Sequence, residues 1–180
     1  ADTLTARLGT GRRLHAKRMA CVAAVYTIDP FVRTPEDIFP ARARPVEPPI
    51  RPRPQHKRVW ASLEQTPDEV ITAMFDEADH RDPRHQKTWV ALVDGNKTQI
   101  RILRRLARER QLTLHIVVDV IHVAEYVWKA GLAFHAPDSP ALDAWVRTRL
   151  LEILRGHASQ VAGGMRRSAT LQALPAAVRT

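Results

Sequence analysis

The sequence of 180 residues contains a single cysteine, Cys21. One cysteine excludes an internal disulfide and a zinc site built on several cysteines, and it is typical of a reducing compartment. Long apolar runs are also absent: the run at 114–118 is interrupted by His115 and is far shorter than the roughly 20 residues of a membrane helix. The N-terminus has no apolar stretch of signal-peptide type ahead of its basic cluster. We therefore expect a cytoplasmic protein without a membrane partner.

Several familiar site motifs are missing as well. The sequence has no G-x-G-x-x-G, and "DGNKT" lacks the glycine directly before lysine that a phosphate-binding loop needs. Three histidines, His115, His122 and His135, are spaced too far apart for a dedicated zinc set. The chain also begins with Ala1 rather than methionine, which indicates an internal start or processing.

Positive charge is what the sequence has in excess. Lys and Arg number 28 against 19 Asp and Glu, which gives a net charge of +9. Because arginine binds phosphate in a bidentate manner, this excess favours a nucleic-acid partner. The alternative is that arginine is abundant because the coding DNA is GC-rich. The apolar content of 44% is enough for one globular domain with a core.

The first part of the chain is divided by composition. Residues 19–28, "MACVAAVYTI", form an apolar run that predicts a strand, so we assign 1–28 to a basic N-terminal segment and a core strand. Residues 29–65 contain many prolines with interspersed arginine, which excludes regular hydrogen-bonded structure over most of this stretch. We interpret 29–65 as an insertion or linker.

The middle of the chain, 66–136, has the pattern of a βαβ unit. Thr66, Pro67 and Glu69 predict the start of a helix over about 67–80. A buried strand over 88–93, a helix over about 97–110 and the strand "LTLHIVVD" follow within about 30 residues, and strands connected in this way are parallel. From Asp119 onward the spacing is helical, and 137–180 forms a helical region. The fold class is therefore α/β, a βαβ unit followed by a helical C-terminal region.

Two aspartates end the two strands of this unit. Asp94 follows the first strand and Asp119 follows the second. The carboxyl ends of parallel strands lie at the same edge of a sheet, about 4.8 Å apart, and ligands of α/β sheets bind at that edge. Two carboxylates at this edge either repel each other or share a divalent cation. His122, three residues after Asp119, could brace these carboxylates or contact phosphate.

Each of these residues also has a structural interpretation. Asp94 before Gly95 can simply turn the chain, and Asp119 can be a helix N-cap. His122 can equally be a packed core histidine. The residues alone leave these alternatives open.

Five ordered segments together resemble one family. They are "KRMACVAAVYTIDPFVRTPEDI", "RVWASLEQTPDEVI", "KTWVALVDGNKTQI", "IVVDVIHVAEYVWKA" and "AWVRTRLLEILRGHASQVAGGMRRSAT". They look like the DDE transposases of the ISKra type of bacterial insertion sequence, and they cover nearly all of the chain from Lys17 to Leu174. The resemblance implies an RNase H-like fold: three antiparallel strands, a helix, a fourth strand, a helix, a fifth strand and further helices.

The resemblance also implies an activity and a site. Such enzymes cleave and join DNA with Mg²⁺ or Mn²⁺, act on transposon ends and target DNA, and work as homo-oligomers on DNA near the bacterial nucleoid. Asp94 matches the second catalytic aspartate and a metal ligand. The segment "VDVIHV" resembles a D-x-x-H signature that places Asp119, as a metal-site residue, and His122 beside the site. The predicted DNA-binding residues are Arg101, Arg104, Arg105, Arg108, Arg166 and Arg167.

Two departures from the family limit this prediction. The first catalytic aspartate should precede the strand at 19–28, where only Asp2 is found, in no strand context. The final glutamate is expected beyond "MRRSAT", and Glu152 is a poor substitute. We therefore expect an internal fragment with a partial RNase H-like core at 66–136, inactive on its own. One alternative is a non-catalytic, basic nucleic-acid-binding remnant of a decayed mobile element; another is an α/β domain with a small-molecule site at the same edge.

Overall fold

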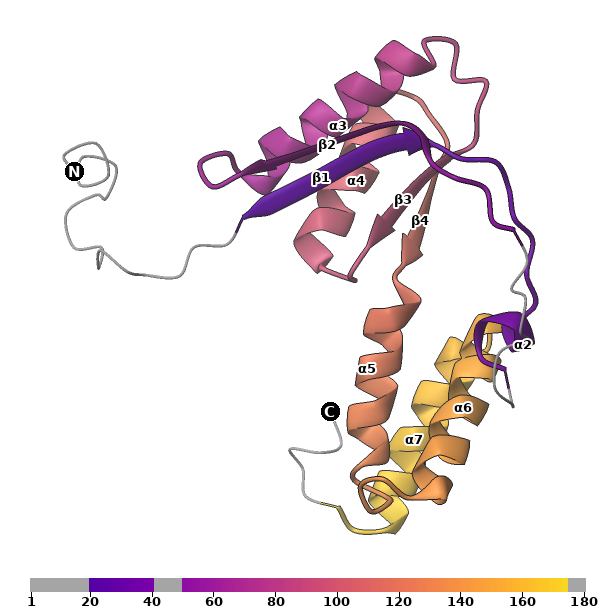
Figure 1. Cartoon of the computed structure of the whole chain (residues 1–180). Coiled ribbons are helices and arrows are strands. Elements are labelled where there is room, and N and C mark those ends of the chain that lie inside the picture. Colours follow the sequence, from indigo (N-terminus) through magenta and orange to yellow (C-terminus); the bar gives the residue numbers. More distant parts are fainter. Residues whose placement is uncertain (1–19, 41–49, 175–180) are drawn as a thin grey trace, which may run out of the picture.

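The computed structural model describes residues 20–40 and 50–174. Predictions that concern residues 1–19, including Asp2, or residues 41–49 and 175–180 fall outside the described residues. Figure 1 shows an upper part made of strands with α3 and α4, and a lower part made of helices. The elements are β1 (Cys21–Thr27), α2 (Pro35–Ile38), β2 (Gln55–Ser62), α3 (Pro67–Arg81), β3 (Trp89–Val93), α4 (Lys97–Glu109), β4 (Leu114–Val118), α5 (Val120–Gly131), α6 (Pro140–Leu154) and α7 (Ala158–Leu171).

Strand β1 pairs with β2 in an antiparallel two-stranded sheet. The register sets Ala23 opposite Trp60 and Val25 opposite Arg58, with an irregularity between Val25 and Thr27. At that irregularity Arg81 of α3 donates to the carbonyl oxygens of Val25, at 3.2 Å, and of His56, at 2.5 Å. The end of α3 is thereby tied to both strands.

Strand β2 corrects the prediction made for 29–65. That stretch was predicted to be an extended insertion or linker, yet Gln55–Ser62 is a strand. The prolines of this stretch end at Pro54, so every residue of β2 retains the backbone N–H that a ladder requires. The predicted strand at 19–28 is confirmed as β1, and β2 supplies its partner.

The predicted βαβ unit is confirmed. Strands β3 and β4 are parallel neighbours, with α4 between them in the chain. Helix α3 begins with the predicted capping box, in which the Thr66 side chain accepts the Glu69 N–H and the Glu69 carboxylate accepts the Thr66 N–H. Both helices lie on one face of the strands and bury a common core of Ile71, Phe75, Ala91, Ile102, Leu103, Leu106 and Ala107.

The helical part has a core of its own. Val127 of α5 packs with Leu142, Val146 and Leu150 of α6. Gly131 permits this close approach, because a Cβ at that position would lie 2.6 Å from the Leu142 side chain. Helix α5 was included in the predicted 66–136 region, but in the structure it lies with α6 and α7 (Figure 1). The division between the two parts falls at the end of β4.

Within the described part of the predicted helical region at 137–180, the structure has α6 and α7, and α7 continues through Gly163 and Gly164. The described residues thus form a mixed α/β structure with two small sheets and a helical part. Across residues 20–40 and 50–174, no helix has the length and apolar character needed to cross a membrane.

Candidate metal and nucleic-acid site

The two predicted carboxylates lie at one edge of the β3–β4 sheet. Val93 and Val118 are paired in register at the carboxyl ends of the two strands, so Asp94 and Asp119 are the next residues on each. The Asp119 backbone N–H donates to the Val93 carbonyl oxygen at 2.7 Å, which holds the two strand ends together. The structure therefore brings these two residues to neighbouring positions.

The turn after β3 depends on Gly95. This residue has φ +95°, a conformation that costs glycine little because it has no Cβ. A Cβ placed there would lie 3.6 Å from a methyl carbon of Val118, so the turn also passes close to β4. Gly95 lets the chain leave β3 beside the end of β4 and begin α4 at its N-cap, Asn96.

Each carboxylate uses one oxygen in a local hydrogen bond. Oδ1 of Asp94 accepts the Asn96 N–H at 2.8 Å, and Oδ1 of Asp119 accepts the Ile121 N–H at 2.9 Å. These are the turn and N-cap roles that the sequence left open. They do not exclude a ligand role, because the second oxygen of each carboxylate has no hydrogen-bond partner among the described residues.

His122 lies on the first turn of α5 and is partly exposed. Its Nδ1 is 3.9 Å from an oxygen of Glu125, a loose contact along the same helix. It forms no ion pair with Asp94 or Asp119 in the part of the chain that the structure describes. Glu152 lies elsewhere, near the end of α6, where it pairs with Arg155 and His157. A hydrogen bond from His157, followed by one from Arg155, lowers the pKa of Glu152, so this carboxylate is already engaged.

The donor chemistry at the edge fits a divalent ion. Magnesium and manganese prefer carboxylate oxygens, and magnesium commonly keeps several waters beside one or two carboxylates. Asp94 and Asp119 could supply two such oxygens. Within residues 20–40 and 50–174, no three His, Cys, Asp or Glu side chains are grouped closely enough to hold a metal by themselves.

The predicted DNA-binding arginines of α4 fall into two classes. Arg105 pairs with Asp68 of α3 at 2.8 Å and with Glu109 at 3.0 Å. The hydrogen bonds that its guanidinium donates to Glu109, and then to Asp68, raise the pKa of Arg105. The other three, Arg101, Arg104 and Arg108, have no carboxylate partner among the described residues. These three are available to an external anion, whereas Arg105 is held by the protein.

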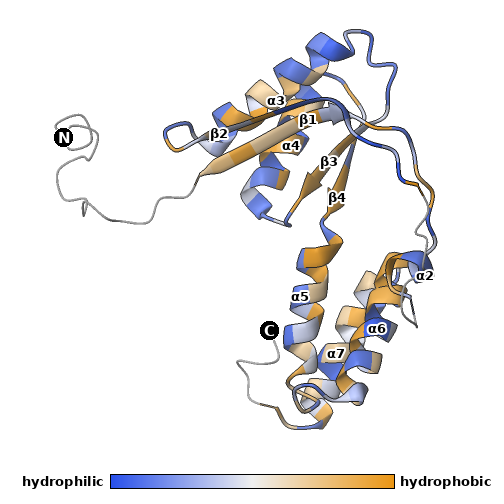
Figure 2. Ribbon diagram, viewed as in Figure 1, coloured by the Kyte–Doolittle hydropathy of each residue, from blue (hydrophilic) through white to orange (hydrophobic). Residues whose placement is uncertain are grey.

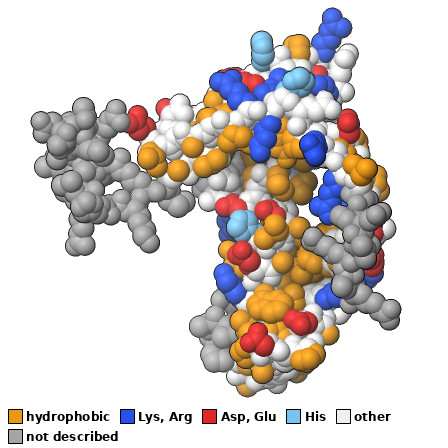
Figure 3. All heavy atoms as spheres, viewed as in Figure 1, with side chains coloured by type: hydrophobic (Ala, Val, Ile, Leu, Met, Phe, Trp, Pro, Cys, Tyr) orange, Lys and Arg blue, Asp and Glu red, His pale blue; other side chains and the backbone are white. Residues whose placement is uncertain are grey.

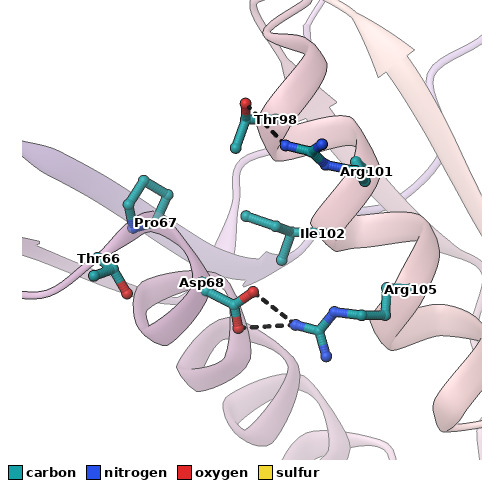
Figure 4. Close-up of a pocket in the computed structure, with 7 residues that line it drawn as sticks. All are labelled: Thr66, Pro67, Asp68, Thr98, Arg101, Ile102 and Arg105. Carbon is teal, nitrogen blue, oxygen red and sulfur yellow. Dashed lines mark hydrogen bonds and ion pairs between the residues drawn. The ribbon is translucent and has the colours of Figure 1, made fainter.

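Arg101 and Arg105 border a hollow between α3 and α4 (Figure 4). The hollow has a volume of about 430 Å³, and Thr66, Pro67, Asp68, Thr98 and Ile102 complete its lining. Among the residues that the structure describes, the one hydrogen bond of the Arg101 side chain is a long contact of 3.5 Å with the Thr98 hydroxyl. Arg166 and Arg167 are exposed on α7, in the other part of the molecule. The structure does not join these two residues to the α4 arginines in one surface.

Sequence reasoning missed one buried charged residue, Asp82. In the structure its carboxylate accepts the backbone N–H groups of Gln86 and Lys87 and the indole N–H of Trp89. The short spacing between the end of the helix and Trp89 was a sequence signal for a tight turn. The sequence did not show that three N–H groups of this turn donate to the Asp82 carboxylate.

A comparison with known protein families, with curated proteins and with solved structures found no match to this chain.

Proposed function

We propose that this chain is part of the catalytic domain of an ISKra-type DDE transposase, with an RNase H-like core that performs metal-dependent cleavage and strand transfer of DNA. The observation that carries the proposal is the sheet edge where Asp94 and Asp119 end neighbouring parallel strands. The segments that resemble the family supply the expectation, and this edge supplies a place for its chemistry.

The order of elements supports an RNase H-like core. In the family plan, β1 and β2 correspond to the second and third antiparallel strands and α3 to the helix after them. Strands β3 and β4, joined by α4, correspond to the fourth and fifth strands. The plan also has a first strand. Within the described residues β1 and β3 each pair with one strand only, so each has an edge where that first strand could add.

The proposed roles follow from position and charge. Asp94 would hold a magnesium or manganese ion, with Asp119 beside it and His122 as a supporting residue. When bound, such ions stabilise the attacking and leaving oxygens of a phosphodiester. The arginines without carboxylate partners, Arg101, Arg104 and Arg108, would contact DNA phosphates, and Arg166 and Arg167 would add a second contact. Phosphate contacts position the DNA but do not read its sequence.

The test is cleavage by the full transposase that contains this sequence, acting as an oligomer on DNA that carries transposon ends. Asp94→Asn should abolish cleavage, because a neutral amide cannot supply the charge that a divalent ion requires. Asp119→Asn should lower the rate about 10- to 100-fold, as expected for a supporting residue. Both substitutions should preserve the fold, because asparagine accepts the same backbone hydrogen bonds at a turn and at an N-cap.

Asp138→Asn is the matched control. Asp138 is exposed in the loop before α6 with φ +56°, a conformation that asparagine also tolerates. The Asp138→Asn substitution should leave the cleavage rate unchanged. Cleavage by Asp94→Asn near the wild-type rate would contradict the proposal. DNA binding by the wild-type protein without any cleavage would support the non-catalytic, nucleic-acid-binding alternative instead.

A further inference from the structure

A shallow groove lies between α4 and the outer side of β4. Its volume is about 280 Å³. Its apolar lining comes from Ala107 of α4, from Leu112 and from Leu114 and Ile116 of β4, and two arginines, Arg104 and Arg108, border it. It lies on a different flank of α4 from the hollow that Arg101 and Arg105 border.

The strand that forms one wall of this groove has an open edge. The Asp119 N–H points toward β3, where it meets the Val93 carbonyl. Because backbone groups alternate along a strand, those of Leu114, Ile116 and Val118 point away from β3. No other strand among the described residues pairs with β4. Three successive pairs of N–H and C=O groups are therefore available beside an apolar groove.

The charge at the groove favours an anionic partner, and the open strand edge beside it favours an extended peptide. Neither Arg104 nor Arg108 has a carboxylate partner in the described part of the chain. A second copy of this chain, added edge to edge, would bring its own Arg104 and Arg108 to the same place, and like charges would oppose that pairing. Carboxylates of a peptide segment would instead accept charge-assisted hydrogen bonds from both arginines.

We propose that β4 is a docking edge for an extended, acidic peptide segment of a partner protein. The segment adds as a strand beside β4, places an apolar side chain in the groove over Leu114 and Ile116, and pairs its carboxylates with Arg104 and Arg108. Main-chain hydrogen bonds supply affinity in this mode of recognition, and the side-chain pockets supply specificity. DNA could pair with the arginines but could neither pair with the strand edge nor fill the apolar groove, so peptide and DNA compete for Arg104 and Arg108.

The probe is a fluorescent peptide of sequence TETVTET, whose alternate glutamate and valine side chains lie on one face of a strand. Binding to this chain is measured by anisotropy. We expect saturable binding, and Arg104→Glu or Arg108→Glu should weaken it on the order of tenfold or more, as expected for loss of a charge-assisted hydrogen bond. Arg101→Glu, a matched charge reversal on the other flank of α4, should bind like the wild type. Circular dichroism verifies that each variant is folded.

Two N-methylated probes separate strand addition from simple charge attraction. In an extended peptide, the N–H groups of alternate residues point to opposite sides. The first probe is methylated on the amide nitrogens of one side, and the second probe on those of the other side. Strand addition requires that one probe loses binding and the other retains it. Equal binding by both, no saturable binding of TETVTET, or an equal effect of Arg101→Glu would overturn the proposal, as would binding of duplex DNA at these arginines without binding of the peptide.

Discussion

Asp82 connects the end of α3 to the start of β3. Its carboxylate lies 3.0 Å from the Gln86 N, 2.9 Å from the Lys87 N and 3.0 Å from the Trp89 Nε1, and only 8% of the residue is exposed. The hydrogen bond from the Trp89 indole, followed by that from the Lys87 backbone, holds the pKa of Asp82 below its ordinary value. Trp89 in turn packs against Phe75 of α3. The carboxylate therefore orients the residue with which β3 begins.

Asp82→Asn should lower the stability of the folded chain, because an amide has one acceptor oxygen where the carboxylate has two. The pKa of Asp82 is depressed in the fold, so the advantage of the wild type is present above the ordinary pKa of an aspartate. It is lost as the pH falls through the lower, folded value. Urea unfolding of both proteins at neutral pH and near pH 3 measures the difference in their free energies of unfolding. A stability difference that does not shrink in acid would contradict this role, and Asp138→Asn serves as control.

The residue scale also shows what sequence could not predict. The order Asp94-Gly95-Asn96 and the residue Asp119 predicted strand ends, because turn and cap residues act within two or three positions of themselves. Arg105 looked like its neighbours on the basic face of α4. Its partner Asp68 is 37 positions away in sequence, and only the packing of α3 beside α4 brings the two together.

Among the described helices, α4 separates its apolar residues from its charged residues most completely. Its apolar side packs into the core, and its outer side carries arginines at two flanks. On the side toward α3, Arg101 and Arg105 border the hollow that Asp68 also lines. On the side toward β4, Arg104 and Arg108 border the groove that Leu114 and Ile116 line. The helix could therefore offer phosphate contacts from its free arginines while Arg105 stabilises the contact with α3.

We expect duplex DNA to bind this chain with steep salt dependence and little sequence preference. Affinity should fall on the order of tenfold or more between about 50 and 200 mM salt if several phosphates are contacted. Arg104→Ala should reduce the salt slope by about one, as for the loss of one phosphate contact. Arg105→Ala should change it less, because Arg105 is already paired with Asp68 and Glu109. Equal effects of the two substitutions, or affinity independent of salt, would contradict this account.

Element boundaries followed from local sequence signals where those signals were strong. Thr66, Pro67 and Glu69 predicted the start of α3, and the structure has that capping box. Strand β2 was missed because prolines dominate the stretch before it and because its residues are mostly exposed. Its strand character depends on pairing with β1, about 30 residues earlier in the chain, and local patterns do not report such pairing.

At the scale of the whole molecule, the two sheets have one covered face and one open face. Helices α3 and α4 cover the first, while apolar side chains of β1, β3 and β4 lie on the second (Figure 3). Figure 2 shows β3 and β4 as mainly hydrophobic, and His115 is the polar residue of β4. Val90 and Leu92 on β3 are 59% and 61% exposed, and Val117, the partner of Leu92 on β4, is exposed beside them. Val22 and Tyr26 of β1 are exposed as well. Exposed apolar surface of this kind marks a site of interaction or association.

This open face should bind a hydrophobic dye. The fluorescence of anilinonaphthalene sulfonate should rise with the folded chain, and the double variant Val90→Thr and Leu92→Thr should lose most of that rise. Val32→Thr is the control, because Val32 is 94% exposed and lies outside the strands. If the double variant binds the dye as well as the wild type while its circular dichroism is preserved, that result would show that Val90 and Leu92 do not form the dye-binding surface.

The central claim is that Asp94 and Asp119 form one divalent-ion site, and amide relaxation by Mn²⁺ tests it most directly. Substoichiometric Mn²⁺ should broaden the amide signals of Gly95, Asn96 and Val120 more than those of other residues, because they are adjacent to the two carboxylates. Excess Mg²⁺ should reverse the broadening, and Asp94→Asn should remove it while the remaining spectrum is unchanged. Broadening centred elsewhere, or equal broadening in wild type and Asp94→Asn, would contradict the claim and leave these aspartates as turn and cap residues.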